Sequence, residues 1–183
     1  MAAKKPEKKH IVAIPAGVTM TYQHGVMTAA KGNKTSHKHL ATPEVHIKIE
    51  GSDVHFSPVD KKRKTIAILN ALMAHTQNLI TGAEKGYFYK LTVVHSHFPM
   101  NIAKKENRVE ISNFLGEKAP RIAMILGKDT QVEIKGKEIT VKGPNKEDVA
   151  QTAGNMEIVT REKKKDQRVF QDGIYIVEHG VNA

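Results

Sequence analysis

A segment of ten residues recurs 85 positions further along the chain, and this internal repeat constrains the fold more than any other feature. Residues 47–56 (IKIEGSDVHF) align without a gap with residues 132–141 (VEIKGKEITV). In both copies apolar and polar residues alternate on either side of a glycine, which is the pattern of a β-hairpin with a tight turn. The chain is therefore expected to contain two similar units.

A predicted helix follows each hairpin. The first is expected to end at Gly82, and the second is expected to begin after the cap Asn145, with Asp148 at the acidic position of a capping box. Gly154 weakens the second helix. Apolar positions spaced by three and four residues predict both helices: Ile66, Leu69, Leu72, Met73, Thr76, Leu79 and Ile80 in the first, and Val149, Ala153, Met156 and Val159 in the second.

The order of elements repeats as well. A glycine and a strand-like segment follow each helix, at residues 86–89 and 173–176, and residues 18–25 have a weaker echo in residues 109–116. These patterns predict an α+β fold of two tandem duplicated domains, each an antiparallel sheet packed with one main helix. The predicted boundaries are residues 1–10 for a basic flexible tail, 11–84 for the first repeat and 85–183 for the second.

Charge and composition narrow the function. The 183 residues include 29 Lys and Arg against 19 Asp and Glu, a net charge of +10 that favours a polyanionic partner. The chain contains no cysteine, which excludes disulfides, thiolate zinc sites and thiol nucleophiles and favours an intracellular location. No run approaches the ~18 apolar residues of a membrane helix, so no membrane partner is expected.

Basic residues gather in four segments, at residues 4–9, 31–39, 61–64 and 161–168. The second is expected as a flexible loop, and a simple mobile hairpin tip fits it equally well. The third opens the first helix, where a bound phosphate would compensate cations that the helix dipole disfavours. A solvated, solubilising surface explains the third segment about equally well. The predicted RNA-binding residues are Arg161, Lys163, Lys164, Lys165, Arg168, Gly173, Lys31, Lys34, Lys38, Lys61, Lys62 and Arg63.

The sequence contains no recognisable catalytic site. His95 and His97, like His37 and His39, place two imidazoles close together, but no third metal ligand is suitably spaced. No nucleotide-binding glycine loop or nucleophile motif occurs, so no catalytic residue, metal, cofactor or small-molecule substrate is predicted. The consecutive aromatic residues 87–89 must divide between two strand faces, which favours recognition of the RNA backbone over base stacking.

Residues 166–175 (DQRVFQDGIY) resemble the carboxyl-terminal signature of the universal large-subunit ribosomal protein six family, in its archaeal and eukaryotic branch. The resemblance covers essentially the whole chain. It implies a structural constituent of the large ribosomal subunit that binds large-subunit rRNA near the sarcin–ricin loop and stalk base. It also implies a cytoplasmic location in the ribosome, neighbouring large-subunit and stalk-base proteins as partners, and transient contact with translation factors.

By this resemblance the second repeat is the main RNA anchor, with Lys163, Lys164, Lys165 and Arg168 as the phosphate contacts. The bacterial branch has a Tyr-Lys-Gly-Lys-Gly segment nearby, whose two lysines are missing here. Phe170 is therefore expected to pack, Gly173 to allow close backbone approach in a conformation suited to glycine, and Asp172 to form a turn or pair with arginine. The alternatives are a free-standing RNA-binding module and a metal-dependent hydrolase that uses the histidines.

Overall fold

The structure is a computed structural model that describes residues 10–95, 97–163 and 165–182. It divides into two compact units, Met1–Glu84 and Lys85–Ala183. Apart from His10, the predicted basic tail lies outside the described residues.

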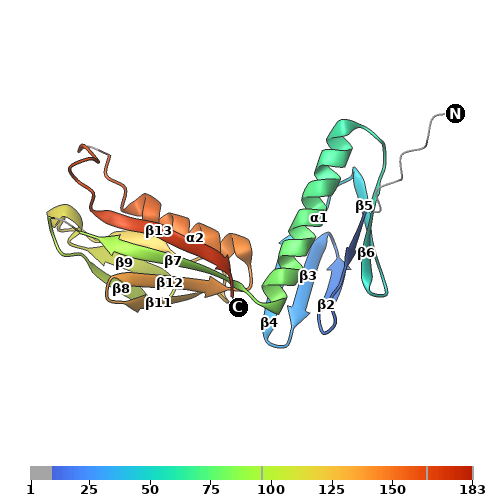
Figure 1. Cartoon of the computed structure of the whole chain (residues 1–183), viewed down its shortest axis with the longest axis horizontal. Coiled ribbons are helices and arrows are strands. Elements are labelled where there is room, and N and C mark those ends of the chain that lie inside the picture. Colours follow the sequence, from blue (N-terminus) through green and yellow to red (C-terminus); the bar gives the residue numbers. More distant parts are fainter. Residues whose placement is uncertain (1–9, 96, 164, 183) are drawn as a thin grey trace. The chain divides into compact units, whose positions relative to one another are not determined.

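Within residues 10–84 the first unit contains six strands and one helix, and the strands form two antiparallel three-stranded sheets in the orders β2-β3-β4 and β1-β6-β5. The helix contacts strands of both sheets, and Figure 1 shows it lying across the strands of its unit. The elements are β1 (Ile11–Ala13), β2 (Thr19–Gln23), β3 (Val26–Lys31), β4 (Lys34–His39), β5 (Val45–Glu50), β6 (Asp53–Pro58) and α1 (Arg63–Glu84).

The second unit repeats this plan with one additional strand. Its sheets have the orders β10-β9-β8 and β11-β12-β7-β13, and its helix again contacts strands of both. The elements are β7 (Tyr87–Val94), β8 (Asn101–Lys105), β9 (Arg108–Ser112), the short 3-10 helix η1 (Phe114–Gly116), β10 (Arg121–Met124), β11 (Gln131–Lys135), β12 (Glu138–Gly143), α2 (Lys146–Val159) and β13 (Gly173–Val181).

The predicted α+β class with a repeated antiparallel unit is confirmed, and so are both hairpins. In the β5–β6 hairpin Glu50 pairs with Asp53 across a turn in which Gly51 has φ +61°. In the β11–β12 hairpin Lys135 pairs with Glu138, and Gly136 has φ +60°. The recurring glycine thus supplies the same left-handed turn conformation in both copies.

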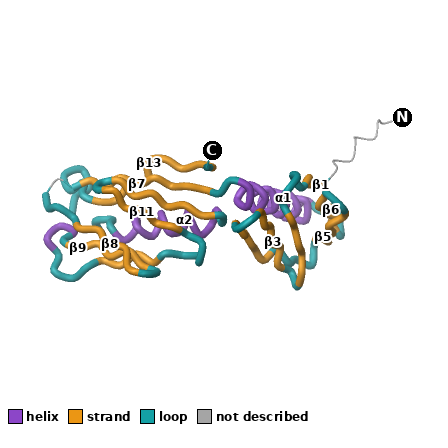
Figure 2. Tube along the Cα trace, turned by 90° about the horizontal axis from the view of Figure 1, so that it is seen from below, coloured by secondary structure: helices purple, strands orange, loops and turns teal. Residues whose placement is uncertain are grey.

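β7, the strand that follows α1, lies within the residues 85–183 expected for the second repeat, and it pairs there with β12 and β13. Figure 2 shows β7 beside β13. One detail of the predicted repeat, the weak upstream echo, differs in the structure. The weak upstream echo is out of step: residues 18–25 contain β2, an edge strand, whereas residues 109–116 contain most of β9, which is central in its sheet. This error arises because local alternation does not reveal which strands pair.

The first helix is longer than predicted. Gly82 does not end α1 but lies buried within it, and Ala83 beyond it is also buried in the core. The helix ends at Glu84, shortly before Gly86 with φ +85°. Ile66, expected on the apolar stripe, is 38% exposed, because the buried stripe of the helix runs through Thr65 and Leu69 and Ile66 lies beside it.

Each unit buries its own core. Met27, Phe56 and Leu69 join the two sheets and the helix of the first unit. Ile111, Ile139 and Met156 do the same in the second. The second helix begins as predicted, with the side-chain oxygen of Asn145 accepting a hydrogen bond from the backbone N–H of Glu147 at 3.1 Å. The buried residues of α2 pack this helix against the core of the second unit, and the segment that follows α2 starts from the end of this helix.

Candidate nucleic-acid interface

The segment between α2 and β13, residues 161–172, is here called the signature loop, and it is anchored where it leaves and rejoins the fold. Arg121 donates from Nη1 to the carbonyl oxygen of Val159 at 2.7 Å, at the end of α2. The hydroxyl of Thr160 accepts a hydrogen bond from the backbone N–H of Ile174 at 3.0 Å, which joins the helix end to β13. Both ends of the loop are therefore fixed to elements of the second unit.

Hydrogen bonds within the loop define its conformation. The carbonyl oxygen of Asp166 accepts from the backbone N–H groups of Val169 and Phe170 at 3.1 and 2.9 Å. Its carboxylate accepts from the backbone N–H of Arg168 at 2.9 Å. A turn bonded in this way loses less conformational entropy on binding a ligand than a disordered segment would.

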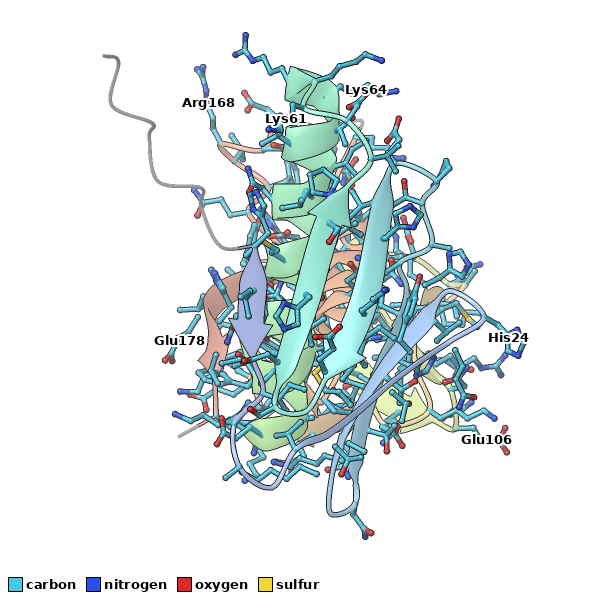
Figure 3. All side chains as sticks on the ribbon, turned by 90° about the vertical axis from the view of Figure 1, so that its right-hand side faces the viewer. His24, Lys61, Lys64, Glu106, Arg168 and Glu178 are labelled. Carbon is cyan, nitrogen blue, oxygen red and sulfur yellow. The ribbon has the colours of Figure 1, made fainter. Side chains whose placement is uncertain are left out.

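The predicted cations of this loop lie at its surface. The side chains of Arg161, Lys163, Lys165 and Arg168 are exposed, and Figure 3 labels Arg168 on the loop. The predicted contact Lys164 lies outside the described residues. The Nζ atom of Lys165 lies 4.4 Å from the centre of the Phe170 ring. The loop thus presents several cations from one anchored segment, as phosphate binding requires.

Asp172, near the end of the signature loop, has a partner that the sequence analysis does not predict. Asp172 is buried and lies 2.6 Å through Oδ2 from Nδ1 of His97, while Oδ1 accepts from the backbone N–H of His97 at 3.1 Å. The partner is therefore a histidine and not the expected arginine. Phe170 packs as predicted, stacked on the His97 ring with 4.6 Å between ring centres. In the sequence only the His-Ser-His pattern at residues 95–97 singles out His97, and that pattern points to a pair of metal ligands and not to a partner for Asp172.

Gly173 is buried, but it does not have the positive φ angle that the sequence analysis expects for a glycine conformation. A Cβ atom there would come within 3.3 Å of the Tyr175 ring. A larger residue at this position would therefore press on the neighbouring aromatic side chain, which would have to shift by a few tenths of an ångström.

The basic segment at residues 31–39 forms a hairpin, the alternative to a flexible loop that the sequence leaves open. It consists of the end of β3, a turn at Gly32 and Asn33, and the strand β4. Lys31 forms an ion pair with Glu84 at 3.2 Å, and the amine of Lys38 lies 3.1 Å from a ring nitrogen of His75. Lys34 is exposed. Lys31 and Lys34 are cross-strand partners, and Lys38 lies four residues after Lys34 in β4, so these three lysines share one face of the sheet. Lys31 and Lys38 are held there by contacts with side chains of α1 and do not belong to a flexible loop.

The cations at the start of α1 have acidic neighbours from the same chain. The Asp60 carboxylate accepts from the Thr65 hydroxyl at 2.5 Å and from Lys62 Nζ at 2.9 Å, and these bonds lower its pKa from 3.8 to about 2. Lys64 pairs with Glu44 at 3.3 Å. Lys61 and Arg63 are exposed, and Figure 3 shows Lys61 and Lys64 at this end of the helix. The Asp60 carboxylate near the N-terminus of α1 therefore already compensates part of the positive charge of this basic segment, the role that the sequence analysis assigns to a bound phosphate.

Across the described ranges, no three histidine, aspartate or glutamate side chains come together as a metal site would need. The same part of the chain contains no helix with the length and apolar character needed to cross a membrane.

The fold and the surface together define a class: a protein of two repeated α+β units with an anchored cationic loop. Comparison with known proteins identifies the family. The profile described as Ribosomal protein L6 matches residues 98–173, which include the signature loop. Large ribosomal subunit protein uL6 of Methanosarcina mazei is 40% identical over 167 residues, covering 91% of this chain and 94% of its own length. The uL6 protein of Methanospirillum hungatei is 42% identical over 170 residues, covering 92% and 96%.

The chain belongs to the ribosomal protein L6 family, as the resemblance at residues 166–175 predicts. It is therefore a structural constituent of the ribosome and not an enzyme. Family membership overturns the alternative of a metal-dependent hydrolase.

Proposed function

We propose that this protein is a structural constituent of the large ribosomal subunit that binds rRNA near the sarcin–ricin loop and the stalk base. In that position it supports the site where translation factors dock, beside neighbouring large-subunit and stalk-base proteins. The archaeal relatives carry the name of a large-subunit protein, which supports the first part of the proposal. The cytoplasmic ribosome is its proposed location.

The signature loop is the main RNA anchor in this proposal, and one observation carries the assignment. Arg161, Lys163, Lys165 and Arg168 are all exposed on a segment fixed at both ends. Each cation placed against a phosphate releases condensed counterions, which drives binding without reading sequence. Lys164 is assigned to the same interface from its position in the chain.

The other predicted residues have graded roles. Lys61 and Arg63 are exposed at the start of α1 and are assigned to direct phosphate contact. Lys31, Lys38 and Lys62 already have partners within the chain, so RNA must compete for them, and Lys34 is assigned with them to a secondary contact. Gly173 is buried and is assigned to supporting the loop instead of contacting RNA.

The salt dependence of RNA binding tests this proposal. The probe is an rRNA fragment that spans the sarcin–ricin loop, and the dissociation constant is measured against salt concentration. Replacing Lys163, Lys165 and Arg168 by alanine should reduce the slope of log K against log salt by about 0.9 for each duplex phosphate that the variant no longer neutralises. The matched control replaces the exposed Lys104, Lys135 and Lys137 of the same unit and should change the slope less.

An unchanged slope in the signature-loop variant, or equal changes in both variants, would contradict the assignment. Sedimentation tests the alternative of a free-standing RNA-binding module. A ribosomal constituent should migrate with the large subunit through a high-salt wash, whereas a free module should remain at the top of the gradient.

A further inference from the structure

We propose that Asp172, His97 and Phe170 form a positioning stack, which holds the ammonium group of Lys165 in place for contact with an RNA phosphate. This inference rests on the proposed function of the signature loop and adds a role for His97, which lies outside the loop. None of these three residues is proposed to touch the RNA itself.

The stack begins with a buried carboxylate. The Asp172 side chain is 1% exposed, and such a group is stable in a protein interior only when hydrogen bonds satisfy it. His97 supplies bonds to both oxygens, from Nδ1 at 2.6 Å and from its backbone N–H at 3.1 Å. Because one residue engages both oxygens, the orientation of the imidazole ring is fixed relative to the carboxylate.

The imidazole in turn fixes an aromatic ring. His97 and Phe170 are stacked with 4.6 Å between ring centres and 25° between ring planes. The backbone N–H of Phe170 also donates to the carbonyl oxygen of Asp166 at 2.9 Å, so the ring is held from both its backbone and its face. His97 lies 75 residues before Asp172, and the contact therefore ties the signature loop to the segment after β7.

The last contact joins the stack to a predicted RNA contact. The Nζ atom of Lys165 lies 4.4 Å from the centre of the Phe170 ring, within the range of a cation–π interaction. A mobile lysine side chain samples many rotamers, and ordering it reduces the affinity that each phosphate contact provides. A lysine already held against an aromatic face loses less entropy when RNA binds.

A double-mutant cycle tests the coupling between the stack and Lys165. Phe170→Leu retains apolar volume but removes the aromatic face, and it should weaken binding of the rRNA fragment about two- to tenfold, the equivalent of ordering one long side chain. Lys165→Ala should weaken binding to a similar degree. The double variant should bind no more than about twofold more weakly than Lys165→Ala alone, because the ring acts through that lysine.

The matched control is a second cycle with Lys163, an exposed neighbour in the same loop. The effects of Phe170→Leu and Lys163→Ala should add, since the stack does not hold Lys163. A merely structural role for Phe170 would affect both cycles alike. His97→Asn, which keeps a donor in the position of Nδ1 but removes the ring, provides a second route to the same test if Phe170→Leu does not fold.

Nuclear magnetic resonance of the full chain without RNA provides an independent readout. The methylene protons of Lys165 next to Nζ should be shifted upfield by the Phe170 ring, and the shift should disappear in Phe170→Leu. Additive effects in both cycles, or the absence of this shift in the unmodified protein, would overturn the inference. If the unmodified protein binds the rRNA fragment without salt dependence, the proposed function itself fails instead.

Discussion

Asp60 illustrates how a single carboxylate alters the electrostatics of a basic cluster. Its oxygens accept hydrogen bonds from Thr65 and from the side chain and backbone of Lys62, which lower its pKa to about 2. The cluster that opens α1 is therefore partly neutralised within the chain. An exposed carboxylate of this kind also makes stability depend on pH in a defined range.

We expect the stabilising effect of Asp60 to be lost in acid. Its folded-state pKa is lowered, so its contribution is fully present above the ordinary value of 3.8 and disappears as the pH falls through about 2. Thermal unfolding at pH 5, 3 and 2 measures this. Asp60→Asn should lower the melting temperature at pH 5 and have little effect at pH 2. An equal deficit at all three pH values would contradict the prediction.

At the scale of elements, two glycines separate the effect of backbone conformation from that of packing. A Cβ atom at Gly154, inside α2, or at Gly136, in the β11–β12 turn, would meet nothing within 4 Å. The two positions differ in backbone conformation, because Gly136 has φ +60° and Gly154 lies within a helix. Alanine should therefore have opposite effects at the two sites.

Gly154→Ala should raise the free energy of unfolding by about 0.5–1 kcal/mol, since alanine reduces the entropy of the unfolded chain and favours the helix. Gly136→Ala, the matched control, should lower it by roughly 1–2 kcal/mol because its backbone must remain left-handed. Urea unfolding measures both variants. The explanation fails if Gly154→Ala is destabilising or if Gly136→Ala is neutral.

Arg121 connects η1, β10 and the end of α2. It donates to both oxygens of Glu117 at 2.8 and 2.6 Å and to the Val159 carbonyl at 2.7 Å, and its guanidinium lies 4.1 Å from the centre of the Phe114 ring. The hydrogen bonds with Glu117 raise the pKa of Arg121 above its ordinary value, so the side chain stays charged. The signature loop therefore begins from a helix end that is held by a charged group.

Arg121→Ala should lower the free energy of unfolding by about 1–2 kcal/mol, because it removes charge-assisted hydrogen bonds and leaves the Val159 carbonyl without this donor. Arg108→Ala, which removes a more exposed arginine paired with Glu110, should lower it by less than about 1 kcal/mol. Urea unfolding again provides the measurement. Equal losses in the two variants would show that Arg121 contributes only as a surface ion pair.

At the scale of the whole molecule, each unit has its own core and its own pair of sheets. Units of this kind should fold separately. A protein of residues 85–183 should therefore unfold cooperatively and give amide spectra that match those residues in the full chain. A molten or unfolded fragment would contradict this expectation. The same fragment should retain most of the RNA affinity if the signature loop is the main anchor.

The sequence by itself determined the local elements and the family. Alternating residues around Gly51 and Gly136 predicted both hairpins, and apolar positions three and four apart predicted both helices. These features depend on interactions between residues close together in the chain, and their patterns are therefore visible in the order of amino acids. The DQRVFQDGIY motif likewise identified the family without knowledge of the fold.

Only the tertiary structure decided how those elements combine. It divided the strands of each unit between two sheets, paired β7 with both β12 and β13, and brought His97 to Asp172 across 75 residues. It also decided for a hairpin over a flexible loop at residues 31–39 and paired several of the predicted cations with groups from the same chain. Contacts of this kind are set by packing between distant segments, which leaves no periodic pattern in the sequence.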